Sequence, residues 1–312
     1  MLPESKSESL LHGPAGEAAD RAWPLALVER ARRCPARPVV TAAGTASARA
    51  PRVRASAGAS GPGVNISFMP DIEDTNAAVW KTDIGVNFWK STESDRERRR
   101  AGHRDLLAEL LPFGADEPFT FVDLGAGTGA AARTILDYFP RAHAILADFS
   151  SQMMAQGVLE LAPYEGRYTY VEFDLTRDGD WPASIPVPVN AVISSLCVHH
   201  LKDERKQALF GEILEHLAPG GWYLNYDPVM APDPVVEEAW LRAGDRRDPS
   251  AADKRAHRTA EEQFRYENHV RYMIPLDPQV AYLRAAGFEG VDVYWKELDF
   301  VIYGGRRPAN IP

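Results

Sequence analysis

The 312-residue sequence has only two cysteines, Cys34 and Cys197, and they form no Cys-x-x-Cys pair. Two isolated thiols provide neither the ligand set of a zinc finger nor a disulfide framework, so both of those classes are excluded. Such sparse cysteine usage is typical of a reducing compartment. We therefore expect a cytoplasmic protein, and we expect no metal centre.

The sequence also lacks a long apolar run and an excess of positive charge. No uncharged apolar segment approaches the roughly 20 residues that span a bilayer, so we expect no association with a membrane. The formal net charge of −9 disfavours a nucleic acid as the main partner, because its phosphates would be repelled. None of these features indicates an oligomeric state.

The first 68 residues differ in composition from the rest of the chain. Residues 42–63 are rich in Ala, Gly, Pro, Ser and Arg and have little periodic apolar content. Burial therefore cannot offset the entropy of ordering them, and we expect residues 1–68 to be a disordered or dispensable tail. Two interpretations stay open for this tail: a transit peptide, or an over-extended start with Met69 as the true initiator.

The next segment, residues 69–115, is expected to be a helical N-terminal cap. It carries Trp80 and Trp89 ahead of a helix predicted at 91–111, which Pro112 and Gly114 end. The arginines Arg96, Arg98, Arg99 and Arg100 lie on the early turns of that helix. They are typical of a solvated helix face, and the alternative is a phosphate-binding face.

From residue 116 to 308, strand-like and helix-like segments alternate. Strands are predicted at 120–124, 143–147, 168–173, 191–195 and 222–226, and at 291–295 and 300–303 for a final antiparallel pair. Residues 228–276 interrupt the rhythm as a polar, helical insertion after the fifth strand. This order predicts an α/β fold, a doubly wound and mostly parallel seven-stranded sheet with helices on both faces.

A glycine turn follows the first predicted strand, in the sequence Asp123-Leu-Gly125-Ala126-Gly127-Thr-Gly129-Ala. Glycines here allow a sharp turn and close approach of a ligand, and the following helix offers unpaired N–H groups. The turn also fits the dinucleotide pattern, with Asp148 as the ribose acid. Asp123 would repel a phosphate but suits a ligand with an ammonium group. No Tyr-x-x-x-Lys pair is present, which removes short-chain dehydrogenases and leaves other nicotinamide enzymes open.

With these blocks in order, the chain resembles the class I S-adenosylmethionine-dependent methyltransferases across about residues 115–305. Further matching blocks are Phe173-Asp174-Leu175, Ile193 to Leu201, Pro219-Gly220-Gly221 and Ala286-Gly287-Phe288. The end of the chain, from Val291 to Gly305, resembles a bacterial subgroup of small-molecule methyltransferases. The resemblance implies a Rossmann-like fold and S-adenosyl-L-methionine as the cofactor.

The resemblance also implies roles for individual residues. Asp123 would lie near the ammonium of the cofactor, Asp148 would hold its ribose, and Asp174 with Leu175 would frame its adenine. The complete set of expected cofactor-binding residues is Asp123, Gly125, Ala126, Gly127, Asp148, Phe149, Asp174, Leu175 and Ser195.

The acceptor side is less defined by sequence. Methyl transfer from a sulfonium is an in-line displacement, so positioning supplies much of the catalysis and a base is needed only for a proton held tightly, as in a hydroxyl. His199 and Tyr226 are the candidate catalytic residues, since each follows or ends a strand at the edge where ligands bind. Asp227 is expected to contact the acceptor beside Tyr226, and the insertion with Trp80 and Trp89 to cover the pocket.

The function expected from the sequence is methyl transfer to a small-molecule acceptor. Two alternatives stay open: a tRNA-modifying methyltransferase, which the Arg96–Arg100 cluster suggests, and a non-catalytic S-adenosylmethionine-binding protein, which the lack of an unambiguous base suggests.

Overall fold

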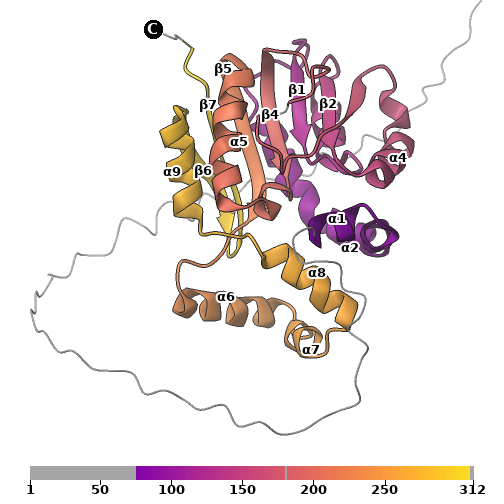
Figure 1. The fold of residues 1–312 in the computed structure, drawn as a ribbon, viewed down its shortest axis with the longest axis vertical. Helices are drawn as coiled ribbons and strands as arrows, with labels where there is room; N and C mark the ends of the chain where they lie inside the picture. Colours follow the sequence, from indigo (N-terminus) through magenta and orange to yellow (C-terminus); the bar gives the residue numbers. More distant parts are fainter. Residues whose placement is uncertain (1–74, 180, 310–312) are drawn as a thin grey trace, which may run out of the picture. The chain divides into compact units, whose positions relative to one another are not determined.

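In the computed structural model, residues 75–179 and 181–309 are described, so the expected tail at 1–68 lies outside the described residues. The described chain forms one seven-stranded sheet in the order β3-β2-β1-β4-β5-β7-β6 (Figure 1). Its strands are β1 (Thr120–Leu124), β2 (His143–Asp148), β3 (Tyr168–Glu172), β4 (Val189–Ser195), β5 (Leu217–Pro228), β6 (Glu289–Glu297) and β7 (Phe300–Arg306).

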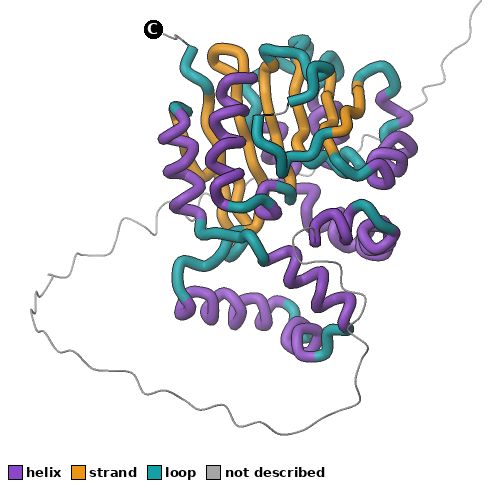
Figure 2. The backbone as a smooth tube through the Cα atoms, viewed as in Figure 1, coloured by secondary structure: helices purple, strands orange, loops and turns teal. Residues whose placement is uncertain are grey.

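The pairing of these strands confirms the predicted doubly wound α/β fold. Strands β1 to β5 run parallel to their neighbours, whereas β7 runs antiparallel to both β5 and β6. The parallel strands therefore all end at one edge of the sheet. Figure 2 shows the sheet in orange with helices in purple around it.

Helices follow the strands as expected from the alternating pattern. Between and after the parallel strands lie α3 (Ala130–Tyr138), α4 (Ser151–Glu160), α5 (Asp203–His216) and α9 (Leu276–Ala286), together with the short 3-10 helices Ala162–Tyr164 and Val198–His200. Ahead of the sheet lie α1 (Thr75–Trp80) and α2 (Asp83–Glu109). The proposed domain boundaries at 68/69 and 115/116 stay predictions.

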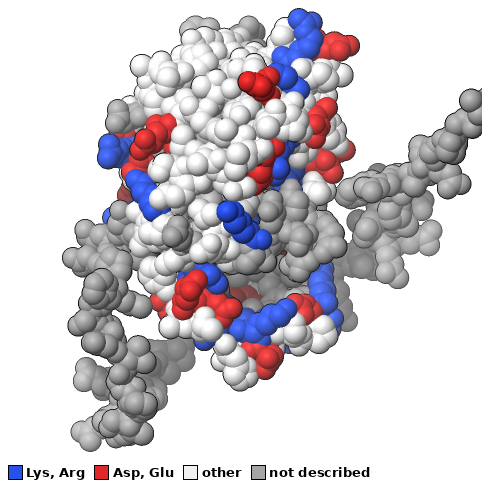
Figure 3. Space-filling model, turned by 90° about the vertical axis from the view of Figure 1, so that its right-hand side faces the viewer, with Lys and Arg blue, Asp and Glu red and all other residues white. Residues whose placement is uncertain are grey.

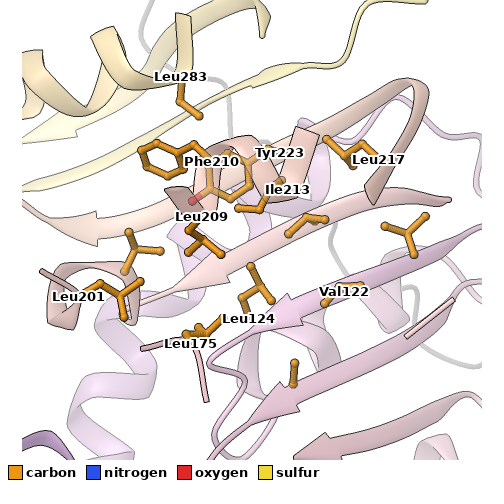
Figure 4. Close-up of a cluster of buried hydrophobic side chains, with 14 of the residues drawn as sticks. Val122, Leu124, Leu175, Leu201, Leu209, Phe210, Ile213, Leu217, Tyr223 and Leu283 are labelled. Carbon is orange, nitrogen blue, oxygen red and sulfur yellow. The ribbon is translucent and has the colours of Figure 1, made fainter. Parts of the chain in front are cut away.

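Two apolar cores hold the helices against the sheet. On one face α5 and α9 pack on β1 and β5, and Figure 4 shows Leu209 and Phe210 of α5 near Leu124, Tyr223 and Leu283. On the other face the end of α2 and the inner side of α3 pack on β1, β2 and β4. Burial on both faces explains why the central strands read as continuous apolar runs in the sequence.

Several predicted boundaries were wrong, and the two largest differences are at the starts of a helix and a strand. The helix expected to begin at residue 91 begins at Asp83, where the Thr82 side chain accepts a hydrogen bond from the main-chain N–H of Ile84 and so caps the helix. The fifth strand, expected from Trp222, begins at Leu217 and includes the block Pro219-Gly220-Gly221. The register with β4 shifts between Leu217 and Trp222, and Gly220 has a φ of 77°, so residues 218–221 form a bulge in the strand.

The insertion after β5 consists of α6 (Pro234–Arg247), α7 (Ala251–Ala256) and α8 (Ala260–Val270). Figure 1 shows these helices below the sheet, on the side where α1 and α2 also lie. A capping box begins α8, because Thr259 Oγ1 accepts from the Glu262 N–H and Glu262 Oε2 accepts from the Thr259 N–H. Within residues 75–179 and 181–309, no helix combines the length and the apolar character needed to cross a membrane.

Candidate active site

A cavity of about 950 Å³ lies at the carboxyl ends of the parallel strands, between the sheet and the helices α1, α2 and α8. Parallel α/β sheets bind ligands at this edge. All eleven residues that the sequence singled out line it: Asp123, Gly125, Ala126, Gly127, Asp148, Phe149, Asp174, Leu175, Ser195, His199 and Tyr226. The structure thus brings the expected cofactor-binding and catalytic residues into one space.

The glycine turn connects β1 to α3 in a backbone conformation that only glycine adopts easily. The φ angles of Gly125, Gly127 and Gly129 are 70°, 55° and 78°. A Cβ atom at Gly125 would lie 2.1 Å from the Sγ atom of Cys197, so a larger residue has no room there. The main-chain N–H of Gly125 donates to the carbonyl of Ala147 at the end of β2, which fixes the turn to the sheet.

Asp123 is a buried carboxylate at the end of β1 with an unsatisfied oxygen. It accepts a hydrogen bond from the main chain of Ala132 in the first turn of α3, while its Oδ2 atom is buried with no hydrogen-bond partner. Burial, with a smaller contribution from the nearby Asp148 carboxylate, raises the pKa of Asp123 to about 8. A buried carboxylate oxygen that lines a cavity and lacks a partner fits a cationic group such as an ammonium.

Asp148 ends β2 and organises the same turn. Its Oδ2 accepts from the Gly127 N–H and its Oδ1 from the Ser150 N–H, both at 2.8 Å. Burial raises the pKa of this carboxyl as well, although these main-chain donors oppose the rise. Each oxygen keeps a second lone pair, so a ribose hydroxyl can still be accepted, and the ribose role stays a prediction.

The loop after β3 places Asp174 and Leu175 on the far side of the turn. Asp174 Oδ1 accepts from the main-chain N–H and the hydroxyl of Thr176. The carbonyl of Leu175 accepts from Nε of the buried Arg205, and Glu212 holds the guanidinium in turn with two contacts of 2.8 Å. A rigidly held loop of this kind can frame a flat ring.

His199 is held by Asp227 at the acceptor side. The 3-10 helix after β4 places the His199 ring 2.6 Å from Asp227, measured from Nδ1 to Oδ1, and the main-chain N–H of His199 donates to Asp227 Oδ2 at 2.7 Å. Burial lowers the pKa of His199, so its ring is neutral, with Nδ1–H donating to the carboxylate. This tautomer leaves a lone pair on Nε2.

The sequence predicted that both Tyr226 and Asp227 contact an acceptor, but of the two only Tyr226 lines the cavity. Tyr226 lines the cavity, and its ring packs 5.0 Å from His103 and 5.8 Å from Phe300, measured between centroids. Burial raises the pKa of Tyr226 to about 12, so the hydroxyl stays protonated and donates. Asp227 is instead buried behind His199 and acts through that ring.

Several cavity residues were not identified from the sequence. They come from the cap and the insertion: Arg104, Arg258, Arg265 and Tyr266. Trp80 and Trp89, which were expected to cover the pocket, line it as well, as does His269. Figure 3 shows charged side chains of both signs low in the view, where the insertion lies. Of the Arg96–Arg100 cluster, Arg100 is the one whose side chain is described, and it lines the cavity. The aromatic and polar content of these segments indicated a cover, but not which side chains face inward.

A family model described as a methyltransferase domain matches residues 122–223. The trans-aconitate 2-methyltransferase of Azoarcus sp. (strain BH72) is 32% identical over 126 residues, which is 40% of this chain and 44% of that protein. The O-methyltransferase sol2 of Alternaria solani is 27% identical over 198 residues, or 58% of this chain and 44% of that protein. Each of these alignments spans less than half of the relative's length.

Solved structures agree on the fold. An O-methyltransferase family protein from Burkholderia thailandensis superimposes with a TM-score of 0.51 at 13% sequence identity, covering 75% of this chain and 64% of that one. At this identity the similarity concerns the fold alone.

Proposed function

We propose that this chain, which contains a class I S-adenosylmethionine-dependent methyltransferase domain, transfers a methyl group from S-adenosylmethionine to a small-molecule acceptor. The observation that carries the proposal is the single cavity in which all the expected cofactor residues lie beside His199 and Tyr226. A cytoplasmic location and the absence of a nucleic-acid partner stay predictions from the sequence.

On the donor side, the residues present fit the proposed cofactor. When bound, it supplies a methyl group already activated by the sulfonium. Asp123 Oδ2 is the oxygen available for the ammonium, and the Gly125–Gly127 backbone gives close approach. Asp148 is assigned the ribose, and Asp174 with Leu175 the adenine. Phe149 and Ser195 complete the lining. Binding the donor in one orientation supplies most of the rate acceleration. The methyl group is already activated, so the reaction chiefly needs the donor and acceptor atoms to be aligned.

On the acceptor side, His199 is the proposed group for loss of an acceptor proton. Asp227 fixes its ring so that Nε2, which lies 3.1 Å from His269 Nδ1 at the cavity, carries the lone pair that would take the proton. Tyr226, protonated throughout the ordinary pH range, is the proposed hydrogen-bond donor to the acceptor. A hydroxyl acceptor matches this pair of side chains better than an amine, which carries a lone pair once neutral.

The first test is binding of the product analogue. Isothermal titration of the full chain with S-adenosylhomocysteine should show saturable binding to a single site, and lack of binding would exclude the proposal. Incubation with methyl-labelled S-adenosylmethionine and a cell extract should then label the small-molecule fraction. Label found in tRNA would favour the tRNA-modifying alternative, and no label in any fraction would favour a non-catalytic binding protein.

The second test concerns His199. His199→Ala should lower transfer to a hydroxyl acceptor by about 10²–10⁴-fold, the usual contribution of a positioned acid–base group. Affinity for S-adenosylhomocysteine should stay within about 2-fold of the unmodified chain, since His199 lies apart from the Asp123 and Asp148 contacts. Unchanged turnover in this variant would remove His199 from the mechanism.

A further inference from the structure

Three histidine side chains meet at the acceptor end of the cavity. His199 and His200 belong to the 3-10 helix after β4, and His269 comes from α8 of the insertion. One ring nitrogen from each lies within 4.8 Å of the other two, and His199 Nε2 is 3.1 Å from His269 Nδ1. All three residues line the cavity, so the cluster faces space that a ligand can enter.

Hydrogen bonds on the opposite ring nitrogens orient two of these side chains. Asp227 takes Nδ1–H of His199, which leaves the Nε2 lone pair directed at His269. His200 is hydrogen-bonded to the main chain of Asn268, while its Nδ1 is buried without a partner. A carboxylate or carbonyl on the far nitrogen is the usual support of a metal-binding imidazole.

We infer that His199, His200 and His269 bind a divalent transition metal ion, with zinc as the best match, and leave a fourth position open to the cavity. Around tetrahedral zinc with Zn–N bonds of about 2.0–2.1 Å, ligand nitrogens are about 3.3 Å apart. The His199–His269 separation already has this value within a few tenths of an ångström. The His200 nitrogen lies within 4.8 Å of the other two, so its ring would have to move closer to complete the site. Three protein ligands and an open position are typical of a catalytic zinc site.

This inference departs from the expectation of no metal centre, which rested on cysteine spacing. His199 and His200 are adjacent, but His269 lies 70 residues after His199, so no local motif contains all three ligands. Binding of the metal does not depend on the proposed function, but its role does. With the ion bound, His199 Nε2 would be a ligand and would not act as the base. A hydroxyl acceptor at the open position would instead have its pKa lowered by the ion and would lose its proton to water before transfer.

The test uses the full chain without a polyhistidine tag, stripped with a chelator and dialysed. Titration with Zn²⁺ against a chromophoric chelator should show about one tightly bound equivalent, as a single site requires. Co²⁺ should give the intense visible absorption of a tetrahedral ion. Absence of both signals would overturn the inference, whether or not the protein binds S-adenosylhomocysteine.

Variants locate the site. His269→Ala removes one ligand from the insertion and should weaken zinc binding by on the order of 100-fold or more, whereas Asp227→Asn should weaken it by about 10–100-fold. The matched control is His257→Ala, whose exposed side chain lies on the surface after α7. Calorimetry with S-adenosylhomocysteine shows that each variant is folded. Equal zinc affinity in His269→Ala and His257→Ala would place the ion elsewhere and overturn the assignment.

Discussion

Asp123 and Asp227 are both buried at the site, but they differ in how many of their oxygen atoms have hydrogen-bond partners. Asp227 accepts from the main chain and ring of His199 and, at 3.5 Å, from the side chain of Asn225. Asp123 has the Ala132 main chain on one side and no partner for Oδ2. Asp227 is therefore a structural partner of His199, whereas Asp123 gains its missing contact only when a ligand binds.

Asp123 should make the ligand-free protein less stable as the pH rises from about 6.5 to 8. Its pKa is about 8 in the folded chain and near 3.9 when unfolded, so the folded state holds the proton more tightly. The stability that this group contributes is therefore complete below the unfolded pKa, and it is lost as the pH rises through the folded pKa of about 8. The loss should be on the order of 1 kcal/mol per pH unit.

Asp123→Asn provides the control for that prediction. The amide has nearly the same shape as the protonated acid but does not titrate, so chemical unfolding of this variant should depend less on pH between 6.5 and 8. At pH 6.5 about half of the histidines in the unfolded chain are still protonated, and burial raises the pKa of Asp227 to about 7, so other groups contribute to the slope in this range. The comparison of the two proteins removes these shared contributions and leaves that of Asp123. Parallel pH profiles for the two proteins would show that Asp123 does not titrate in this range.

At the scale of single elements, the glycine turn depends on Cys197 as well as on backbone conformation. Gly125→Ala should destabilise the fold by about 1–2 kcal/mol for the left-handed conformation and by about 1–3 kcal/mol more for the contact with Cys197. Gly166→Ala is the matched control, since Gly166 has a φ of 78° but nothing within 4 Å of an added Cβ. Urea unfolding should show the larger loss at Gly125, and equal losses would disprove the role of Cys197.

The start of α8 supplies a second prediction at this scale. Thr259→Ala removes the side chain that caps the helix and should cost about 1 kcal/mol. Ser250→Ala, at the N-cap of α7, should cost less, because the Ser250 side chain makes no capping hydrogen bond. Thermal unfolding of both variants measures the difference. A Thr259 variant as stable as the unmodified chain would mean that α8 does not depend on its capping box.

Sequence alone predicted the elements whose signals are local. The strands and the turn at Gly125 follow from neighbouring residues and were found near their expected positions, apart from the start of β5. The contact of His199 with His269 joins positions 70 residues apart, and its existence depends on how the insertion folds back. The true place of Asp227, behind His199, likewise depends on packing that no periodicity in β5 reveals.

For the whole molecule, the charge argues for a small partner. The chain carries 35 Lys and Arg against 44 Asp and Glu, so its net charge repels phosphates at long range. We expect no binding of tRNA in filter assays at low salt, where electrostatic attraction is strongest. Saturable binding that weakens steeply as salt increases would instead support the tRNA-modifying alternative.

The cavity has two walls of different origin. Strand ends and the glycine turn form one wall, and helices α1, α2 and α8 form the other. For the proposed reaction, natural selection can therefore change one wall of the cavity without changing the other. Substitutions or length changes in the insertion can redirect the enzyme to a new acceptor during evolution, while the sheet keeps the same donor. Relatives that diverge in residues 228–276 should then share a methyl source and differ in product.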